Sequence, residues 1–212
     1  MDELGSAPAL VEYFVRGGSW MWALLVCSVI ALAVIIYKSI TLWLAGRGAT
    51  SLVEQSVQLI EAGQTEKAAQ DAASPSSSVA AVLSSIFSAA ENGHITPREA
   101  AEATGAEEMA ALESGLPVLS TIANVAPLIG FLGTVSGMIR AFTAIAEHGM
   151  GEPGVVAAGI GEALITTASG LIVAIPCFIA YSVLNSRVNA LALAMEVAGS
   201  RVASMISGDD AR

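Results

Sequence analysis

Two apolar stretches joined by a short polar turn decide the fold of this chain. The first, residues 117–146, reads PVLSTIANVAPLIGFLGTVSGMIRAFTAIA, and the second, residues 155–184, contains GEALITTASGLIVAIPCFIAYSVL. Each stretch exceeds the roughly 20 apolar residues that a helix needs to cross a bilayer. Between them, residues 147–154 read EHGMGEPG, which is too short and too polar for anything but a turn. The sequence therefore predicts a helical hairpin in a membrane.

Small residues are frequent in both apolar stretches, where a helix that faces lipid favours Leu, Ile and Phe. Gly, Ala, Ser and Thr let helix backbones approach closely, so we expect both helices to pack against other helices on several sides. The polar side chains within these helices then become the candidate functional residues: Asn124, Thr134, Arg140, Glu162, Thr166 and Thr167.

The composition indicates a polytopic membrane protein. Of the 212 residues, 54% are hydrophobic and 13% are charged, with a mean hydropathy of +0.68. A net charge of −10 without a basic cluster argues against nucleic acid as a partner. Cys27 and Cys177 both lie in apolar segments and have no ligand-type neighbours, so we expect neither a disulfide nor a metal site. The sequence shows no catalytic residues, no nucleophile elbow and no phosphate loop, which predicts a protein that is not an enzyme and holds no cofactor.

A third apolar block, residues 19–44, predicts the first membrane helix. Trp20 and Trp22 mark one end of this block and Trp43 marks the other. The tryptophans are separated by roughly 32–35 Å at 1.5 Å per residue, which fits aromatic belts at the two headgroup levels. Residues 1–18 then form an interfacial segment before the membrane.

The region between the first and second membrane helices, residues 45–116, is expected to be helical. Ser51 followed by Glu54 suggests a capping box that opens a helix to about Ala73, and the serine run 76–78 suggests a second helix to about residue 90. A stronger start signal is Thr96-Pro97-Arg98-Glu99, with Thr at the N-cap position, Pro at N1 and Glu at N3. We expect one long helix over 97–146, and a third membrane helix that continues past Leu184 to about residue 205.

The basic residues near the membrane ends predict the orientation. Lys38 and Arg47 lie at the end of the first helix, and Arg187 and Arg201 follow the third, whereas the other side has Arg16 alone. Because Lys and Arg favour the cytoplasm, we expect a multi-pass protein with a periplasmic N-terminus and a cytoplasmic C-terminus. The expected order is a periplasmic or interfacial segment (1–18), membrane helix 1 (19–44), a cytoplasmic helical region (45–116), membrane helix 2 (117–146), a periplasmic turn (147–154), membrane helix 3 (155–184) and a cytoplasmic C-terminal helix (185–212).

The motif APLIGFLGTVSGMIRAF, followed by EALITTASGLIVAIPCFIAY, resembles the ExbB/TolQ/MotA family of ion-driven motor proteins. Three membrane helices in 212 residues resemble the ExbB/TolQ branch rather than the four-helix MotA subunits. The resemblance implies an all-α membrane protein with long cytoplasmic helical extensions. It also implies a homo-pentameric ring in the bacterial inner membrane around two ExbD/TolR-like single-span partners. Proton flow would then drive energy transduction to the outer membrane or envelope, with a TonB/TolA-like protein as a further candidate partner.

The same resemblance carries functional roles to particular residues. It places Thr134, Thr167 and Glu162 on the proton pathway, with Thr166 beside them, and makes Pro127 and Pro176 the candidate helix kinks. Helix rise puts Thr134 and Thr167 at the same depth, roughly 18 Å from the turn, where they could form one polar layer in the lumen. The alternative is that each hydroxyl bonds a carbonyl one turn earlier in its own helix.

Arg140 is a departure from the family pattern. It lies six residues outward from Thr134, and Glu162 lies five residues outward from Thr167, so both are expected within about 1.5 Å of the same depth. An unpaired charge is costly there, and pairing with Glu162 on the same or a neighbouring subunit would relieve that cost. The alternative is that Arg140 extends outward to the lipid headgroups.

Two other functional classes compete with the motor interpretation. A stand-alone membrane transporter or channel would usually show internal repeats or paired broken helices, and the sequence shows neither. A structural scaffold would have no need of intramembrane Thr and Glu side chains. The sequence leaves open which envelope process is energised and whether the ion is H⁺ or Na⁺.

Overall fold

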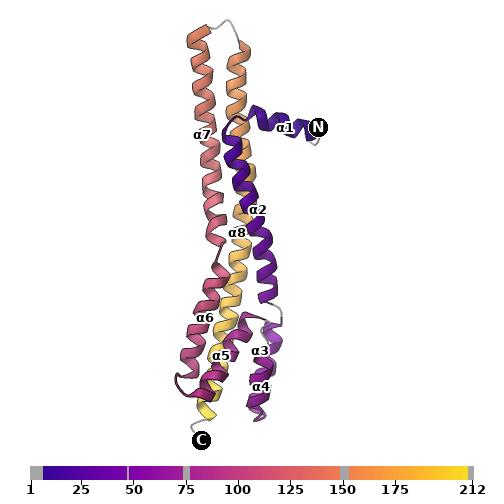
Figure 1. The fold of residues 1–212 in the computed structure, drawn as a ribbon, viewed down its shortest axis with the longest axis vertical. Helices are drawn as coiled ribbons and strands as arrows, with labels where there is room; N and C mark the ends of the chain where they lie inside the picture. Colours follow the sequence, from indigo (N-terminus) through magenta and orange to yellow (C-terminus); the bar gives the residue numbers. More distant parts are fainter. Residues whose placement is uncertain (1–6, 47, 74–76, 149–152, 210–212) are drawn as a thin grey trace. The chain divides into compact units, whose positions relative to one another are not determined.

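The protein is all-α. The computed structural model describes residues 7–46, 48–73, 77–148 and 153–209, and within these residues every regular element is an α-helix (Figure 1). Three stretches of the described chain are long and apolar enough to cross a bilayer, at Trp20–Ala45, Pro97–Glu147 and Gly154–Gly208. The predicted fold class, with three membrane helices and long helical extensions, is therefore confirmed.

Each predicted membrane span falls almost entirely within one helix, and the third helix continues past Leu184 as expected. Helix α2 spans Trp20–Ala45, α7 spans Leu116–His148 and α8 spans Pro153–Asp209. Pro127 lies inside α7 and Pro176 inside α8, and both helices continue through their proline. A kink at either position stays a prediction. The predicted periplasmic turn falls largely on residues 149–152, which lie outside the described residues.

The described chain divides into two compact units. The first comprises residues 7–35 and 117–182, and the second comprises residues 36–116 and 183–209. Helices α2 and α8 contribute to both. The candidate pathway residues all lie in the first unit.

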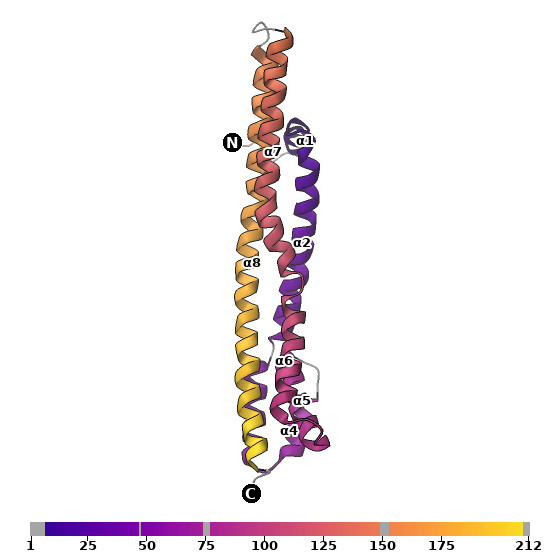
Figure 2. The ribbon, with the colours of Figure 1, turned by 90° about the vertical axis from the view of Figure 1, so that its left-hand side faces the viewer.

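In the first unit, α7 and α8 run antiparallel and side by side, and the short helix α1, Ala7–Arg16, leaves α2 at a steep angle (Figures 1 and 2). Gly17 and Gly18 form the corner between α1 and α2. Gly18 has a φ of +73°, a left-handed conformation that favours glycine. The rings of Phe14 and Trp22 meet edge to face across this corner, with centroids 5.0 Å apart.

The second unit is built on α5, which spans Ser78–Asn92. Its buried apolar side chains contribute to the core of the unit: Val79, Ala80, Val82, Leu83, Ile86, Phe87 and Ala89. Ser77 is the N-cap of α5, and its hydroxyl accepts a hydrogen bond from the Ala80 N–H. The serine run therefore starts this helix, as predicted.

The predicted single helix from Ser51 to Ala73 is wrong. The segment forms two helices, α3 at Ala49–Glu61 and α4 at Thr65–Ala72, and Gly63 between them has a φ of +70°. The expected capping box at Ser51 is also absent, because Ser51 lies inside α3 and its hydroxyl donates to the Gly48 carbonyl. A left-handed glycine after the last helical turn is a common way for a helix to end.

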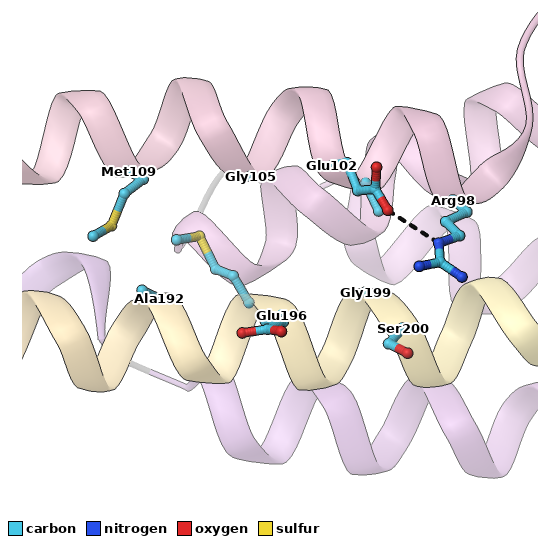
Figure 3. Close-up of a pocket in the computed structure, with 10 residues that line it drawn as sticks. Arg98, Glu102, Gly105, Met109, Ala192, Glu196, Gly199 and Ser200 are labelled. Carbon is cyan, nitrogen blue, oxygen red and sulfur yellow. Dashed lines mark hydrogen bonds and ion pairs between the residues drawn. The ribbon is translucent and has the colours of Figure 1, made fainter.

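Helix α6 begins at the predicted capping box. It spans Pro97–Glu113, and the Thr96 and Glu99 side chains each bond the other's backbone N–H. The Thr96 backbone N–H, and then the Thr96 hydroxyl, donate to Glu99 Oε2, and both hydrogen bonds lower the pKa of the Glu99 carboxyl. A cavity of about 440 Å³ lies between α6 and α8 (Figure 3). Arg98 and Glu102 line it and are joined by a hydrogen bond from the Arg98 guanidinium. Gly105 on α6 and Gly199 on α8 also line the cavity and have no side chain to fill it.

The expected single helix over 97–146 is interrupted. Helix α6 ends at Glu113, α7 begins at Leu116, and the connecting Gly115 has a φ of +80°. Ser114 has a ψ of 136°, which takes the chain out of the helical conformation. The second membrane helix therefore starts afresh at the glycine and does not continue α6.

Candidate functional site

The α7–α8 hairpin holds the candidate pathway residues, and small residues bring its two helices into backbone contact. A Cβ added to Gly137 would lie 2.7 Å from the Gly159 carbonyl oxygen, and one added to Gly159 would lie 2.8 Å from the Gly137 carbonyl oxygen. Lower in the hairpin, a Cβ added to Gly170 would lie 2.7 Å from the Ala126 carbonyl oxygen. Small residues that permit such an approach are typical of tightly packed membrane helices.

An ion pair joins the two helices of the hairpin. The Arg140 guanidinium on α7 donates to Glu162 Oε1 on α8. The Glu162 side chain is only 12% exposed, whereas that of Arg140 is 54% exposed. The side chains of Arg140 and Glu162 thus meet across the hairpin within a single chain.

The glycine corner between α1 and α2 lies directly against Glu162. A Cβ added to Gly18 would overlap the Glu162 carboxylate and would come within 3.4 Å of the Arg140 guanidinium. Only a glycine leaves room for the ion pair at this point. No local sequence pattern predicts that Gly17 and Gly18 contact the third membrane helix.

Thr166 is a packing residue in this structure. Its side chain is fully buried, and its hydroxyl donates to the Gly17 carbonyl at 3.0 Å and to the Glu162 carbonyl at 2.7 Å. Its methyl group lies against Gly133, where any side chain would collide with it. Thr166 therefore fixes the α1–α2 corner on α8, and the pathway role predicted for it stays a prediction.

Thr134 and Thr167 lie on the two facing helices of the hairpin, and Thr167 is beside Gly130, one turn from Thr134. The Thr167 hydroxyl donates to the Ala163 carbonyl at 3.1 Å and to the Gly130 carbonyl of α7 at 3.3 Å. The Thr134 hydroxyl donates to the Phe131 carbonyl of its own helix at 2.7 Å. Within the described residues, each hydroxyl thus bonds a carbonyl and no hydrogen bond joins the two threonines. Each hydroxyl oxygen can still accept a hydrogen bond from water or a partner side chain, and the shared layer stays a prediction.

A cavity opens beside the ion pair. It has a volume of about 590 Å³, and its lining includes Arg16, Arg140 and Glu162 together with Val155, Gly159 and Ile165. Arg16 is bonded to Glu12 on α1 at 2.5 Å. Two guanidinium groups and one carboxylate therefore face this space. Among the described residues, no group of His, Cys, Asp and Glu side chains has the arrangement of a metal site.

Another contact that the sequence did not predict joins α2 to α7. The Trp20 indole N–H donates to the Ser136 hydroxyl at 3.1 Å. Trp20 signals a membrane boundary in the sequence, and a buried indole N–H needs an acceptor. The need of the Trp20 indole N–H for an acceptor could have suggested a hydroxyl-bearing residue at the same depth on another helix.

Comparison with known proteins agrees with this architecture. Residues 64–197, more than half of the chain, match the MotA/TolQ/ExbB proton channel family. The chain is 33% identical to the biopolymer transport protein ExbB-like 1 of Synechocystis over 189 residues, covering 86% of this chain and 73% of that protein.

Two further relatives match over shorter stretches. The Tol-Pal system protein TolQ of Haemophilus influenzae is 48% identical over 84 residues, covering 40% of this chain and 37% of TolQ. The biopolymer transport protein ExbB of Pseudomonas putida is 38% identical over 98 residues, covering 46% of this chain and 30% of that ExbB. The chain thus spans well under two thirds of these two relatives. The family match over more than half of the chain and the extensive match to the ExbB-like protein show the family. The chain belongs to the ExbB/TolQ branch of the MotA/TolQ/ExbB proton channel family.

Proposed function

We propose that this chain is the ring-forming subunit of a proton-driven motor in the bacterial inner membrane. Five copies surround two single-span helices of ExbD/TolR-like partners, and proton flow turns one component against the other. The motion is passed to the outer membrane or envelope, with a TonB/TolA-like protein as a candidate recipient. Similarity to TolQ and to ExbB proteins supports the class of machine, and the hairpin supports the part that this chain plays.

The observation that carries the proposal is the packing of the α7–α8 hairpin. Its two helices contact each other through glycine backbones, so their large side chains are left on the outer faces. These exposed apolar side chains include Leu128, Phe131, Leu132 and Phe142 on α7, and Leu164, Ile172, Phe178 and Ile179 on α8. Faces of this kind need lipid or neighbouring helices around them. A ring of such hairpins provides those neighbours.

The carboxylate that carries the proton comes from the partner in this proposal. None of the three apolar blocks contains an Asp. The one Glu within them, Glu162, is already paired with Arg140. A ring whose own carboxylate is neutralised conducts little by itself. Thr134 and Thr167 then supply hydroxyls to a carboxyl or water that enters the lumen.

The orientation that we propose has the N-terminus in the periplasm and the C-terminus in the cytoplasm, from the Lys/Arg asymmetry. In a variant that lacks Cys27 and Cys177, a cysteine introduced at Met150 should react with an impermeant reagent added to spheroplasts. A cysteine at Gln64 should react only after the membrane is broken. If only the cysteine at position 64 were labelled in intact spheroplasts, the orientation would be the opposite of the one proposed.

The experiment that tests the pathway is replacement of Thr134 or Thr167 by Val, which keeps the shape of the side chain and deletes the hydroxyl. We expect each variant to insert and assemble normally, because each hydroxyl bonds only backbone carbonyls in the folded chain. Proton uptake by vesicles that contain the chain and its partner should fall roughly tenfold or more if the hydroxyls serve the moving proton. Thr143→Val is the matched control, since Thr143 also bonds a carbonyl in its own helix. Full uptake by both test variants would make the two threonines structural.

A further inference from the structure

Lys38 is a buried lysine with no place in the pathway described above. It lies on α2 within the second unit, and only 3% of the residue is exposed. Its Nζ donates to the Ala111 carbonyl at 3.0 Å, the Leu112 carbonyl at 3.1 Å and the Ser114 hydroxyl at 3.1 Å. An ammonium group has three N–H donors, and here all three have acceptors. Lysine is almost never buried without such compensation.

The three acceptors lie together at the C-terminal end of α6. A helix ends with carbonyls that have no partner in the helix, and the negative end of its dipole favours a cation there. The Ser114 N–H bonds the Ala110 carbonyl, and the next two carbonyls, of Ala111 and Leu112, accept from Lys38. The cap of α6 is therefore supplied by a residue that lies 73 positions from Ala111 in the sequence.

This cap is located at the break between α6 and α7. Ser114, the third acceptor, is followed by Gly115 in the left-handed conformation and by the start of α7 at Leu116. Lys38 thus bonds the last turn of α6 and the first residue of the connection to α7. Without the ammonium, two carbonyls and the Ser114 hydroxyl would have no donor from α2 to hold them in place.

We propose that Lys38 is a positioning residue of the motor, which pins the end of α6 to α2 and so fixes the start of the second membrane helix. We call the hydrogen bonds of Lys38 to Ala111, Leu112 and Ser114 the pin. The pin acts on α7 through Ser114 and Gly115, and Lys38 does not contact the transported ion. This inference rests on the proposed function, since it assigns Lys38 to the output of the motor. The pin itself is a structural contact, and it can be measured independently of any activity.

The chemistry of this chain suits a direct measurement, because Lys38 and Lys67 are its only two lysines. Lys67 is exposed on α4. In the purified complex of full-length chain and partner, acetic anhydride should modify Lys67 and leave Lys38 protected until the protein is denatured. Equal modification of both lysines in the native complex would overturn the pin.

Three variants separate positioning from simple stability. Lys38→Met removes the ammonium and keeps the apolar stem, and Lys38→Arg restores a cationic donor. Ser114→Ala is a milder test, because it removes one acceptor of Lys38 together with a hydroxyl that donates to the Ala111 carbonyl at 2.7 Å. Lys67→Met is the control for loss of a lysine charge. The measurements are hydrogen exchange of the α6 end, assembly with the partner, and proton uptake by vesicles per assembled complex.

We expect Lys38→Met to speed amide exchange over residues 109–114 about tenfold or more, because charge-assisted hydrogen bonds are lost. It should also lose most of its proton uptake per assembled complex, whereas Lys38→Arg and Lys67→Met should retain theirs. Ser114→Ala should fall between Lys38→Met and the unaltered chain, which keeps the test informative if Lys38→Met fails to assemble.

Two results would overturn the inference. Unchanged exchange in Lys38→Met would mean that no pin exists, whatever happens to uptake. Faster exchange with full uptake would mean that the contact stabilises α6 without positioning anything for the motor. If the unaltered complex shows no proton uptake, the proposed function fails and the positioning role fails with it, while labelling and exchange still report whether the contact exists.

Discussion

Gly159→Ala is expected to disrupt the α7–α8 hairpin, whereas Gly161→Ala, two residues further along the same helix, is expected to leave it intact. A Cβ at Gly159 would lie 2.8 Å from the Gly137 carbonyl oxygen and 2.9 Å from the Ala141 Cβ, and neither atom can move without its helix. A Cβ at Gly161 meets nothing within 4 Å. Forcing an extra carbon into a packed contact typically costs about 1–3 kcal/mol, and more where only backbone can yield.

The two alanine variants can be compared by native mass spectrometry of the extracted protein. The unaltered chain and Gly161→Ala should give the mass of five subunits, and Gly159→Ala should give smaller species or little folded protein. A Gly159→Ala variant that assembles as completely as Gly161→Ala would contradict the close approach of the two helices.

Reversing the charges of the Arg140–Glu162 pair one at a time is expected to impair assembly and activity, and reversing both together to restore much of the loss. Arg140→Glu would place two carboxylates in contact, and Glu162→Arg would place two guanidinium groups there. We expect each to cost about 1–3 kcal/mol, less than a fully buried pair, because the Arg140 side chain is half exposed. The double reversal recreates an ion pair, although the Gly18 corner fits the shorter carboxylate better on α8.

The control for this experiment is the Arg98–Glu102 pair on α6. Both of its side chains are well exposed, at 82% and 67%, and they are one helical turn apart. Such surface pairs contribute little, so Arg98→Glu should leave assembly and proton uptake nearly unchanged. The measurement is the yield of assembled complex and its uptake for each variant. If the double reversal at Arg140 and Glu162 performs no better than the worse single variant, then the pair has no role as a pair.

The features that could be predicted from the sequence are those that depend on length or on neighbouring residues. The three membrane helices follow from apolar runs long enough for a bilayer. The start of α6 follows from Thr96 and Glu99, which are three residues apart and bond each other directly. That Arg140 and Glu162 come close enough to pair follows from the rise of two antiparallel helices joined by a short turn.

The features that could not be predicted depend on residues far apart in the sequence. The Thr166 hydroxyl, for example, bonds the Gly17 carbonyl, 149 positions away, and no local pattern indicates that contact. The end of α6 likewise depends on Lys38. In the sequence, Lys38 only indicated the cytoplasmic side of the membrane, and no local pattern predicts which helix end it caps.

The α3–α4 break shows a different limit, that of competing local signals. Ser51 and Glu54 have the spacing of a capping box, yet the helix begins earlier at Ala49, and its end is set by Gly63 in the left-handed conformation. A glycine inside an amphipathic pattern either is tolerated in the helix or ends it. Packing of α3 and α4 in the second unit favours the ending here.

The central claim is that this chain forms a proton path only together with a partner, and proton uptake into liposomes tests it most directly. Liposomes that carry the chain alone, the chain with an ExbD/TolR-like partner, or lipid alone are given the same membrane potential, and internal pH is followed with a trapped dye. We predict uptake above the lipid background only when chain and partner are present together. Uptake by the chain alone at the rate of the complex, or no uptake by the complex, would contradict this claim.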